Sequence, residues 1–234
     1  MDERIFMEVS SMQAVGERPE LYQLMGLLFR QEPTRETGIV LAGLLVGDYF
    51  PLERVDVSGE MGELASSLAT SRRQLIETLS ARGEEAFAEV LGREYYELFF
   101  DPAGIKVSLW ESSYVNDDQM LFQAPNWQTK ESYRSHGFEL ANANFPGDHL
   151  STELDFLHLL CERETGLGWP EAPSTGELGR ILDDHLDFLN EHPLSWLPAL
   201  CRGLEDSRST IYLALAGMTL DACRLDAELV RRGR

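Results

Sequence analysis

The segment that decides the fold runs from residue 84 to residue 99 and reads EEAFAEVLGREYYELF. Its large apolar side chains recur at intervals of three or four residues, at Phe87, Val90, Leu91, Tyr95, Leu98 and Phe99. That spacing places them on one face of an α-helix, because a helix turns once every 3.6 residues. The segment therefore predicts an amphipathic helix with one apolar side to bury.

Helical periodicity extends over most of the chain. Further apolar stripes cover 19–30, 34–46, 60–81, 126–140, 148–165 and 174–190, and a last one begins near 206. Asp148 is an expected N-cap, Ser174 and Glu177 match a capping box, and Pro193 suits a first helical turn. These signals predict an all-α fold of about nine helices around one core. We expect a single domain over residues 1–234, with N- and C-terminal halves that could join near 101–127.

Residues 101–127 differ from the helical segments on both sides. They contain Asp101-Pro102, Gly104 and Ala124-Pro125, and apolar residues alternate briefly from Ile105 to Leu109. This pattern predicts a long ordered connection with one short extended piece. Long connections in compact domains are often functional, so this one is a candidate binding segment.

The charge balance limits the classes of partner. The chain has 234 residues, with 20 Lys+Arg and 40 Asp+Glu, which gives a net charge of −20. Nucleic-acid binding is disfavoured because phosphate contacts need basic side chains, and an anionic membrane surface is disfavoured for the same reason. A basic partner would be attracted, although the charge could equally serve solubility alone.

Cysteines and apolar runs indicate the compartment. The three cysteines, at 161, 201 and 223, form no CxxC pair, so neither a disulfide framework nor a zinc ribbon is expected. The N-terminal residues lack the pattern of a secretory signal. The longest apolar stretch, IVLAGLLV at 39–46, is too short to span a bilayer. We therefore expect a cytoplasmic protein with reduced thiols and no membrane insertion.

Enzymatic chemistry has little support in the sequence. No GxSxG, P-loop or GxGxxG motif is present, and Cys161 lies on an apolar stripe. We therefore predict no catalytic residue, no metal and no cofactor. The alternative is a metal-dependent enzyme that uses His149, Glu153 and Asp155, which share one predicted helix.

Aromatic residues gather between positions 95 and 114. Some lie on the predicted helix, whereas Trp110 and Tyr114 lie on the connection that follows it. Aromatic side chains on loops are common anchors for peptides, so these two are equally consistent with a binding surface and with a core. Leu98 and Phe99, on the helix face, favour the core.

Four groups of residues, taken in order, resemble one protein family. They read EYYELF at 94–99, WESSY at 110–114, PGDH at 146–149 with ELDFL at 153–157, and FLNEH at 188–192 with WLP at 196–198. This order resembles the TorD/DmsD family of cytoplasmic chaperones for molybdenum-containing oxidoreductases, over about residues 15–220. Asp101-Pro102 departs from the Gly-Pro common there, and Trp110 stands where a proline is common, so the peptide that is bound could differ.

The resemblance implies a function and a site. Such chaperones are not enzymes; they bind the twin-arginine signal peptide and the apo-form of a molybdopterin oxidoreductase subunit, and delay its export until the cofactor is inserted. Some form domain-swapped dimers, so a monomer or a homodimer is implied, and GTP binding has been proposed for some. The implied peptide-binding residues are Tyr95, Leu98, Phe99, Trp110, Glu111, Tyr114, Asp148 and His149.

A twin-arginine leader makes two physical demands on its receptor. Guanidinium groups pair with carboxylates, and the apolar part of the leader needs an aromatic and aliphatic groove. We expect His149 to act as a brace whose neutral ring fixes the connection around 101–118. The candidate carboxylates for the arginines are Glu94, Glu97, Glu111, Asp117, Asp118, Asp148 and Glu153.

Overall fold

A computed structural model describes residues 18–47, 59–115, 124–140, 145–166 and 171–233. Within these ranges the chain is all-helical, which confirms the predicted fold class, and nine of the helices have twelve residues or more. They are α2 (Arg18–Arg30), α3 (Arg35–Val46), α4 (Glu60–Arg82), α5 (Glu84–Tyr95), α7 (Ala124–Ser135), α8 (Leu150–Thr165), α9 (Thr175–Glu191), α10 (Pro193–Asp206) and α11 (Ile211–Gly233). A π-helical turn, η2 (Tyr96–Phe100), extends α5, and α6 (Ser112–Val115) is a single turn.

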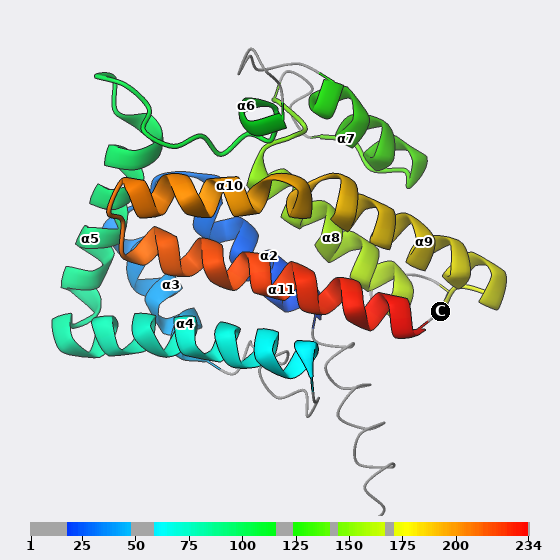
Figure 1. Ribbon diagram of the computed structural model, residues 1–234, viewed down its shortest axis with the longest axis horizontal. Helices are drawn as coiled ribbons and strands as arrows, with labels where there is room; N and C mark the ends of the chain where they lie inside the picture. The colour runs from blue at the N-terminus through cyan, green and yellow to red at the C-terminus, as the bar shows by residue number, and fades with distance from the viewer. Residues whose placement is uncertain (1–17, 48–58, 116–123, 141–144, 167–170, 234) are drawn as a thin grey trace, which may run out of the picture.

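The C-terminal helix α11 is the centre of the bundle. It packs against α4 on one side and against α10 and α9 on the other, as Figure 1 shows. Its buried face includes Tyr212, Leu215, Met218 and Leu225, which recur at helical spacing. Two further helix pairs, α2 with α8 and α3 with α5, complete the core.

An aromatic cluster joins α5 and η2 to this centre. The Tyr95 and Phe99 rings lie 5.1 Å apart, and the Phe99 and Tyr212 rings are separated by the same distance, both edge to face. Phe29 of α2 adds a fourth ring 5.8 Å from Tyr212. Such contacts stabilise a core beyond the area that they bury, so this face of 84–99 is fixed by packing.

Two predicted helix boundaries are wrong. The helix expected over 126–140 ends at Ser135, because Gly137 adopts a left-handed φ of 78° and the amide of Phe138 turns back to the Tyr133 carbonyl at 2.9 Å. The last helix begins at Ile211 rather than near Asp206, where α10 ends. The break between them includes Arg208, which has a φ of 56°.

The expected N-cap of α8 is also wrong, whereas two other helix-start signals are confirmed. His149, not Asp148, caps α8, because its ring Nδ1 accepts a hydrogen bond from the Ser151 amide at 3.2 Å. Ser174 caps α9 in the predicted capping box with Glu177, and Pro193 lies in the first turn of α10.

Candidate peptide-binding site

The described part of the connection after η2 folds back onto the bundle and is held at two points. The Lys106 and Val107 amides donate hydrogen bonds to the Leu98 carbonyl at 3.0 and 3.1 Å. Trp110 and His149 then form an isolated antiparallel bridge, whereas residues 105–109, where the alternation predicts a short extended piece, contain bends. We call residues 104–115 the site loop; α6 forms its last turn, and 116–123, with Asp117 and Asp118, lies outside the described residues.

Asp148 and His149 hold the site loop from the start of α8. The Asp148 carbonyl accepts a hydrogen bond from the Glu111 amide at 2.9 Å, and its Oδ2 accepts one from the Ser112 amide at 3.0 Å. Asp148 therefore caps α6 rather than its own helix. The His149 ring lies 5.1 Å from the Trp110 ring, edge to face. Burial lowers the pKa of His149 to about 4, so the ring is neutral, as predicted for a brace.

Behind the site loop lies a group that we call the loop carboxylate cluster. It consists of Glu111, Asp148, Glu153, His192 and Trp196, all of them buried. Glu111 lies 2.9 Å from Nδ1 of His192, and the Trp196 indole donates to Glu153 at 3.1 Å. The cluster joins the loop to α8 and α10. Sequence reasoning assigned no role to His192 or Trp196, although both lie in the FLNEH and WLP segments that resemble the family.

The outer side of the site loop forms a groove. Its cavity is about 410 Å³, and its walls include Ile105, Val107, Trp110, Tyr114 and Gly203. The Tyr114 hydroxyl donates to the Ser108 carbonyl at 2.7 Å, and its ring stacks on Trp196 at 5.3 Å. The groove therefore combines an aromatic and aliphatic wall with the polar side chains of Lys106, Ser108 and Ser113, and its Tyr114 ring rests on Trp196 of the loop carboxylate cluster.

Exposed apolar side chains continue from the groove along the chain. Phe100 is 65% exposed and Ile105 is 57% exposed, and the turn between them is closed by a bond from the Gly104 amide to the Asp101 carbonyl. Large apolar side chains that are exposed to solvent close together in the chain often belong to an interaction surface.

The structure divides the eight predicted site residues into three groups. Trp110 and Tyr114 line the groove. Tyr95, Leu98 and Phe99 are buried in the core beneath it. The remaining three, Glu111, Asp148 and His149, are buried and hold the site loop from behind.

The candidate carboxylates for the arginines also separate. Glu94 is engaged elsewhere, because its carboxylate accepts bonds from Ser209, Thr210 and the Ile211 amide at the start of α11. Glu111, Asp148 and Glu153 are buried. Glu97 lies 3.9 Å from Arg93 of α5 in an exposed ion pair, and with about half of its side chain in solvent it is the described candidate that can meet a partner at the surface.

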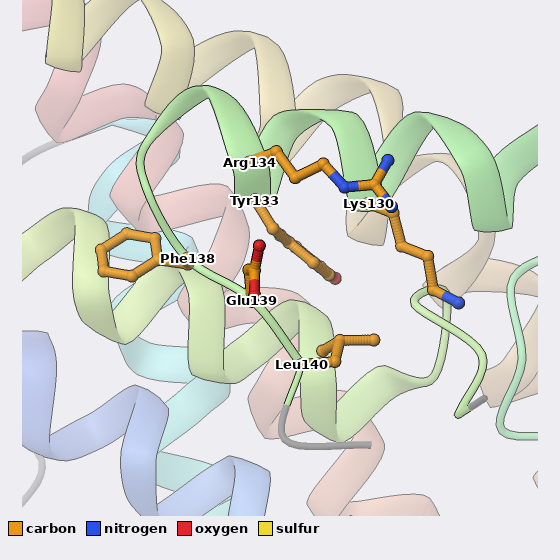
Figure 2. A pocket seen from close by; sticks show the side chains of 6 residues that line it. All are labelled: Lys130, Tyr133, Arg134, Phe138, Glu139 and Leu140. Atoms are coloured by element: carbon orange, nitrogen blue, oxygen red, sulfur yellow. The ribbon is translucent and has the colours of Figure 1, made fainter. Parts of the chain in front are cut away.

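A second pocket has a different character. It measures about 170 Å³ and lies between α7 and the segment that follows it. Figure 2 shows Lys130 and Arg134 of α7 on its rim, above the Tyr133 ring and Leu140. The Glu139 carboxylate lies beside these two cations, so the pocket is lined by both signs of charge.

The residues of the alternative metal site are engaged separately. His149 bonds to Ser151, Glu153 accepts from Trp196, and Asp155 accepts from Arg30 at 2.6 and 2.8 Å. Among the described residues, the group whose ligand atoms come together is instead Cys161, Glu164 and His185. The Arg18 guanidinium pairs with Glu164 there, so this group already has a cation.

Arg18 belongs to a buried arrangement that we call the charge network, made of Arg18, Tyr22, Glu164, His185 and Asp226. Arg18 pairs with both carboxylates, and the Tyr22 hydroxyl donates to Asp226 at 2.6 Å. His185 contacts both carboxylates as well, and their charges outweigh burial and raise its pKa to about 9. Two cations therefore balance two anions between α2, α8, α9 and α11.

Comparison with known proteins identifies the family. The model of the nitrate reductase delta subunit family matches residues 62–202, which is more than half of the chain. The chain belongs to this family. The TorD chaperone of Vibrio cholerae strain O395 is 27% identical over 208 residues, and the match covers 87% of each chain. The TorD chaperone of Photobacterium profundum is 25% identical over 216 residues, and the match covers 90% of this chain and 93% of the relative.

Among solved structures, the chain is similar to a candidate redox enzyme maturation protein from Archaeoglobus fulgidus. The TM-score is 0.47 at 19% identity, over 86% of this chain and 91% of that one. The sequence matches confirm the predicted TorD-type family membership: the protein is a chaperone of molybdoenzyme maturation and not an enzyme. No described helix meets the length and hydropathy that a bilayer crossing needs.

Proposed function

We propose that this chaperone binds the twin-arginine leader of a molybdopterin oxidoreductase subunit and holds the apo-subunit until its cofactor is inserted. The observation that carries the proposal is the groove of the site loop, which Trp110 and Tyr114 line together with exposed Ile105; exposed Phe100 lies five residues before Ile105 in the chain. Rigid aromatic walls next to exposed apolar residues suit the apolar part of a leader.

Charge supports the same partner. The net charge of −20 attracts a cationic segment over a distance set by the salt concentration. Glu97, three residues before Phe100 on η2, has an exposed carboxylate whose long surface pair with Arg93 a leader guanidinium could replace. The buried residues Glu111, Asp148 and His149 act indirectly in this proposal, by holding Trp110 and Tyr114 in place, and Tyr95, Leu98 and Phe99 support the loop from the core.

The test is calorimetric titration of the purified chain with a synthetic twin-arginine leader peptide. We expect binding that Trp110→Ala weakens about tenfold or more, because a buried aromatic anchor contributes upward of 1–2 kcal/mol to an interface. The matched control is Trp127→Ala, since Trp127 lies on α7 and is 63% exposed. Equal affinity for Trp110→Ala and the wild type would remove the groove from the site.

A second peptide tests the role of the arginines. It carries lysines in place of the two arginines and so keeps the charge but not the planar guanidinium. We expect weaker binding, because only arginine pairs with a carboxylate through two parallel hydrogen bonds. Identical affinities would indicate an acidic adaptor that responds to charge alone.

A further inference from the structure

The carboxyl group of Glu153 is an unusual feature of the loop carboxylate cluster. It lies in the first turn of α8 with none of its side chain exposed. The Trp196 indole donates to its Oε2, whereas its Oε1 is buried and receives no hydrogen bond from a described donor. A buried carboxylate oxygen without a donor is costly if the group is ionised.

The surroundings of Glu153 add negative rather than positive charge. Glu111 and Asp148 are the nearest carboxylates, and His192, the basic group of the cluster, is bonded to Glu111. Tyr133 of α7 and Cys223 of α11 also face Glu153, and neither supplies a cation. Burial first, and then the charge of Glu111, raise the pKa of Glu153 well above its usual range.

We propose that Glu153 is a positioning residue for the leader site: its buried, donor-free Oε1 is protonated and acts as the donor in a hydrogen bond to Glu111. Two ionised carboxylates cannot bond to each other, whereas a proton on the donor-free Oε1 turns this contact into a hydrogen bond. This inference rests on the proposed function, because it concerns how the leader site is held.

The consequence is a fixed position for Glu111, and through it for the groove. Its side chain is held between His192 on one side and Glu153 on the other, while its amide bonds to the Asp148 carbonyl. Trp110 is its neighbour in the chain, so the orientation of the groove wall follows from the position of Glu111. Loss of the Glu153 donor would leave two buried acceptors facing each other at this point.

Two substitutions separate the donor from the shape of the side chain. Glu153→Gln keeps the shape and supplies an amide N–H in place of the acid proton, whereas Glu153→Met keeps the length without a donor. We expect leader affinity close to that of the wild type for Glu153→Gln, and a loss of about tenfold for Glu153→Met. Glu205→Gln, at an exposed position of α10, is the matched control for a changed charge, and circular dichroism checks the fold.

Infrared difference spectroscopy at neutral pH observes the proton directly. We expect the carbonyl band of a protonated carboxyl group in the wild type, and its loss in Glu153→Gln. A missing band, or equal losses of affinity for the Gln and Met variants, would overturn the inference. If the wild type bound no leader peptide, the proposed function would fail, and the infrared band would still show whether Glu153 is protonated. If the wild type bound the leader but showed no band, only the inference about Glu153 would fail.

Discussion

The charge network and the loop carboxylate cluster are both buried and polar, but they differ in charge balance. The network places Arg18 and a protonated His185 against Glu164 and Asp226, so two positive charges meet two negative ones. The cluster places three carboxylates around one histidine.

The difference also lies in what each group joins. The network connects four long helices, α2, α8, α9 and α11, whereas the cluster connects a loop to the ends of helices. In a balanced network each buried charge has a partner, so the removal of one member leaves an uncompensated charge and destabilises the fold. An unbalanced cluster under a groove costs stability and is typical of a functional site. The network therefore fits a role in the fold, and in the function that we propose the cluster supports the leader site.

The largest expected effect breaks the network. Asp226→Asn keeps the shape of the side chain but removes the anion that pairs with Arg18 and His185. We expect the free energy of unfolding to fall by about 3–5 kcal/mol, the usual cost of leaving buried charge unpaired. Urea unfolding followed by circular dichroism measures this change. Asp187→Asn, at an exposed position of α9, is the control and should change stability by less than about 0.5 kcal/mol.

The pH dependence of stability gives a second test of the network. The pKa of His185 is about 9 in the folded protein and near 6.5 when unfolded, so its contribution is complete below pH 6.5 and is lost as pH rises through 9. Over this window the wild type should lose about 3 kcal/mol more than His185→Gln, at 1.36 kcal/mol per pKa unit. Parallel stability curves for the two proteins would show that His185 is not charged in the fold.

A smaller effect on the fold is expected at the brace of the site loop. His149→Ala removes the cap of α8 and the ring beside Trp110, so we expect weaker leader binding with a stability loss of about 1 kcal/mol. Calorimetry with the leader peptide and circular dichroism measure the two effects. Affinity equal to that of the wild type would show that the loop needs no support from this ring.

The smallest expected effect on stability lies at the exposed surface. Phe100→Ser should change the free energy of unfolding by less than about 0.5 kcal/mol, because this side chain is largely in water already. Leader affinity should nevertheless fall, since the substitution removes an exposed apolar contact. A variant that is destabilised but binds normally would mean that Phe100 belongs to the fold and not to the surface.

Local sequence signals predicted the helices well. The period of apolar residues gave α5 and α8, and the capping box gave the start of α9, since these depend on neighbours within a few residues. Boundaries that depend on distant contacts were missed. Asp148 precedes α8 as a cap should, but its carboxylate bonds to the Ser112 amide, 36 residues away in the chain.

The places that the proposed site residues take in the fold could be anticipated only in part, for the same reason. The resemblance indicated Trp110 and Tyr114, which line the groove, together with six residues that the structure places in the core or behind the loop. Residue type alone cannot tell a buried carboxylate from an exposed one. Glu111 pairs with His192, which lies between α9 and α10, and Glu153 pairs with Trp196 of α10. Both partners became evident only from the packing.

The most direct test of the assignment is hydrogen–deuterium exchange with and without the twin-arginine leader peptide. Binding at the groove predicts slower exchange over 105–115 and the first turn of α8, with no change in α11 near Asp226. The lysine peptide should protect the same amides less. Protection that appeared in α11, or around the pocket of Lys130 and Arg134, with none over 105–115, would contradict the account.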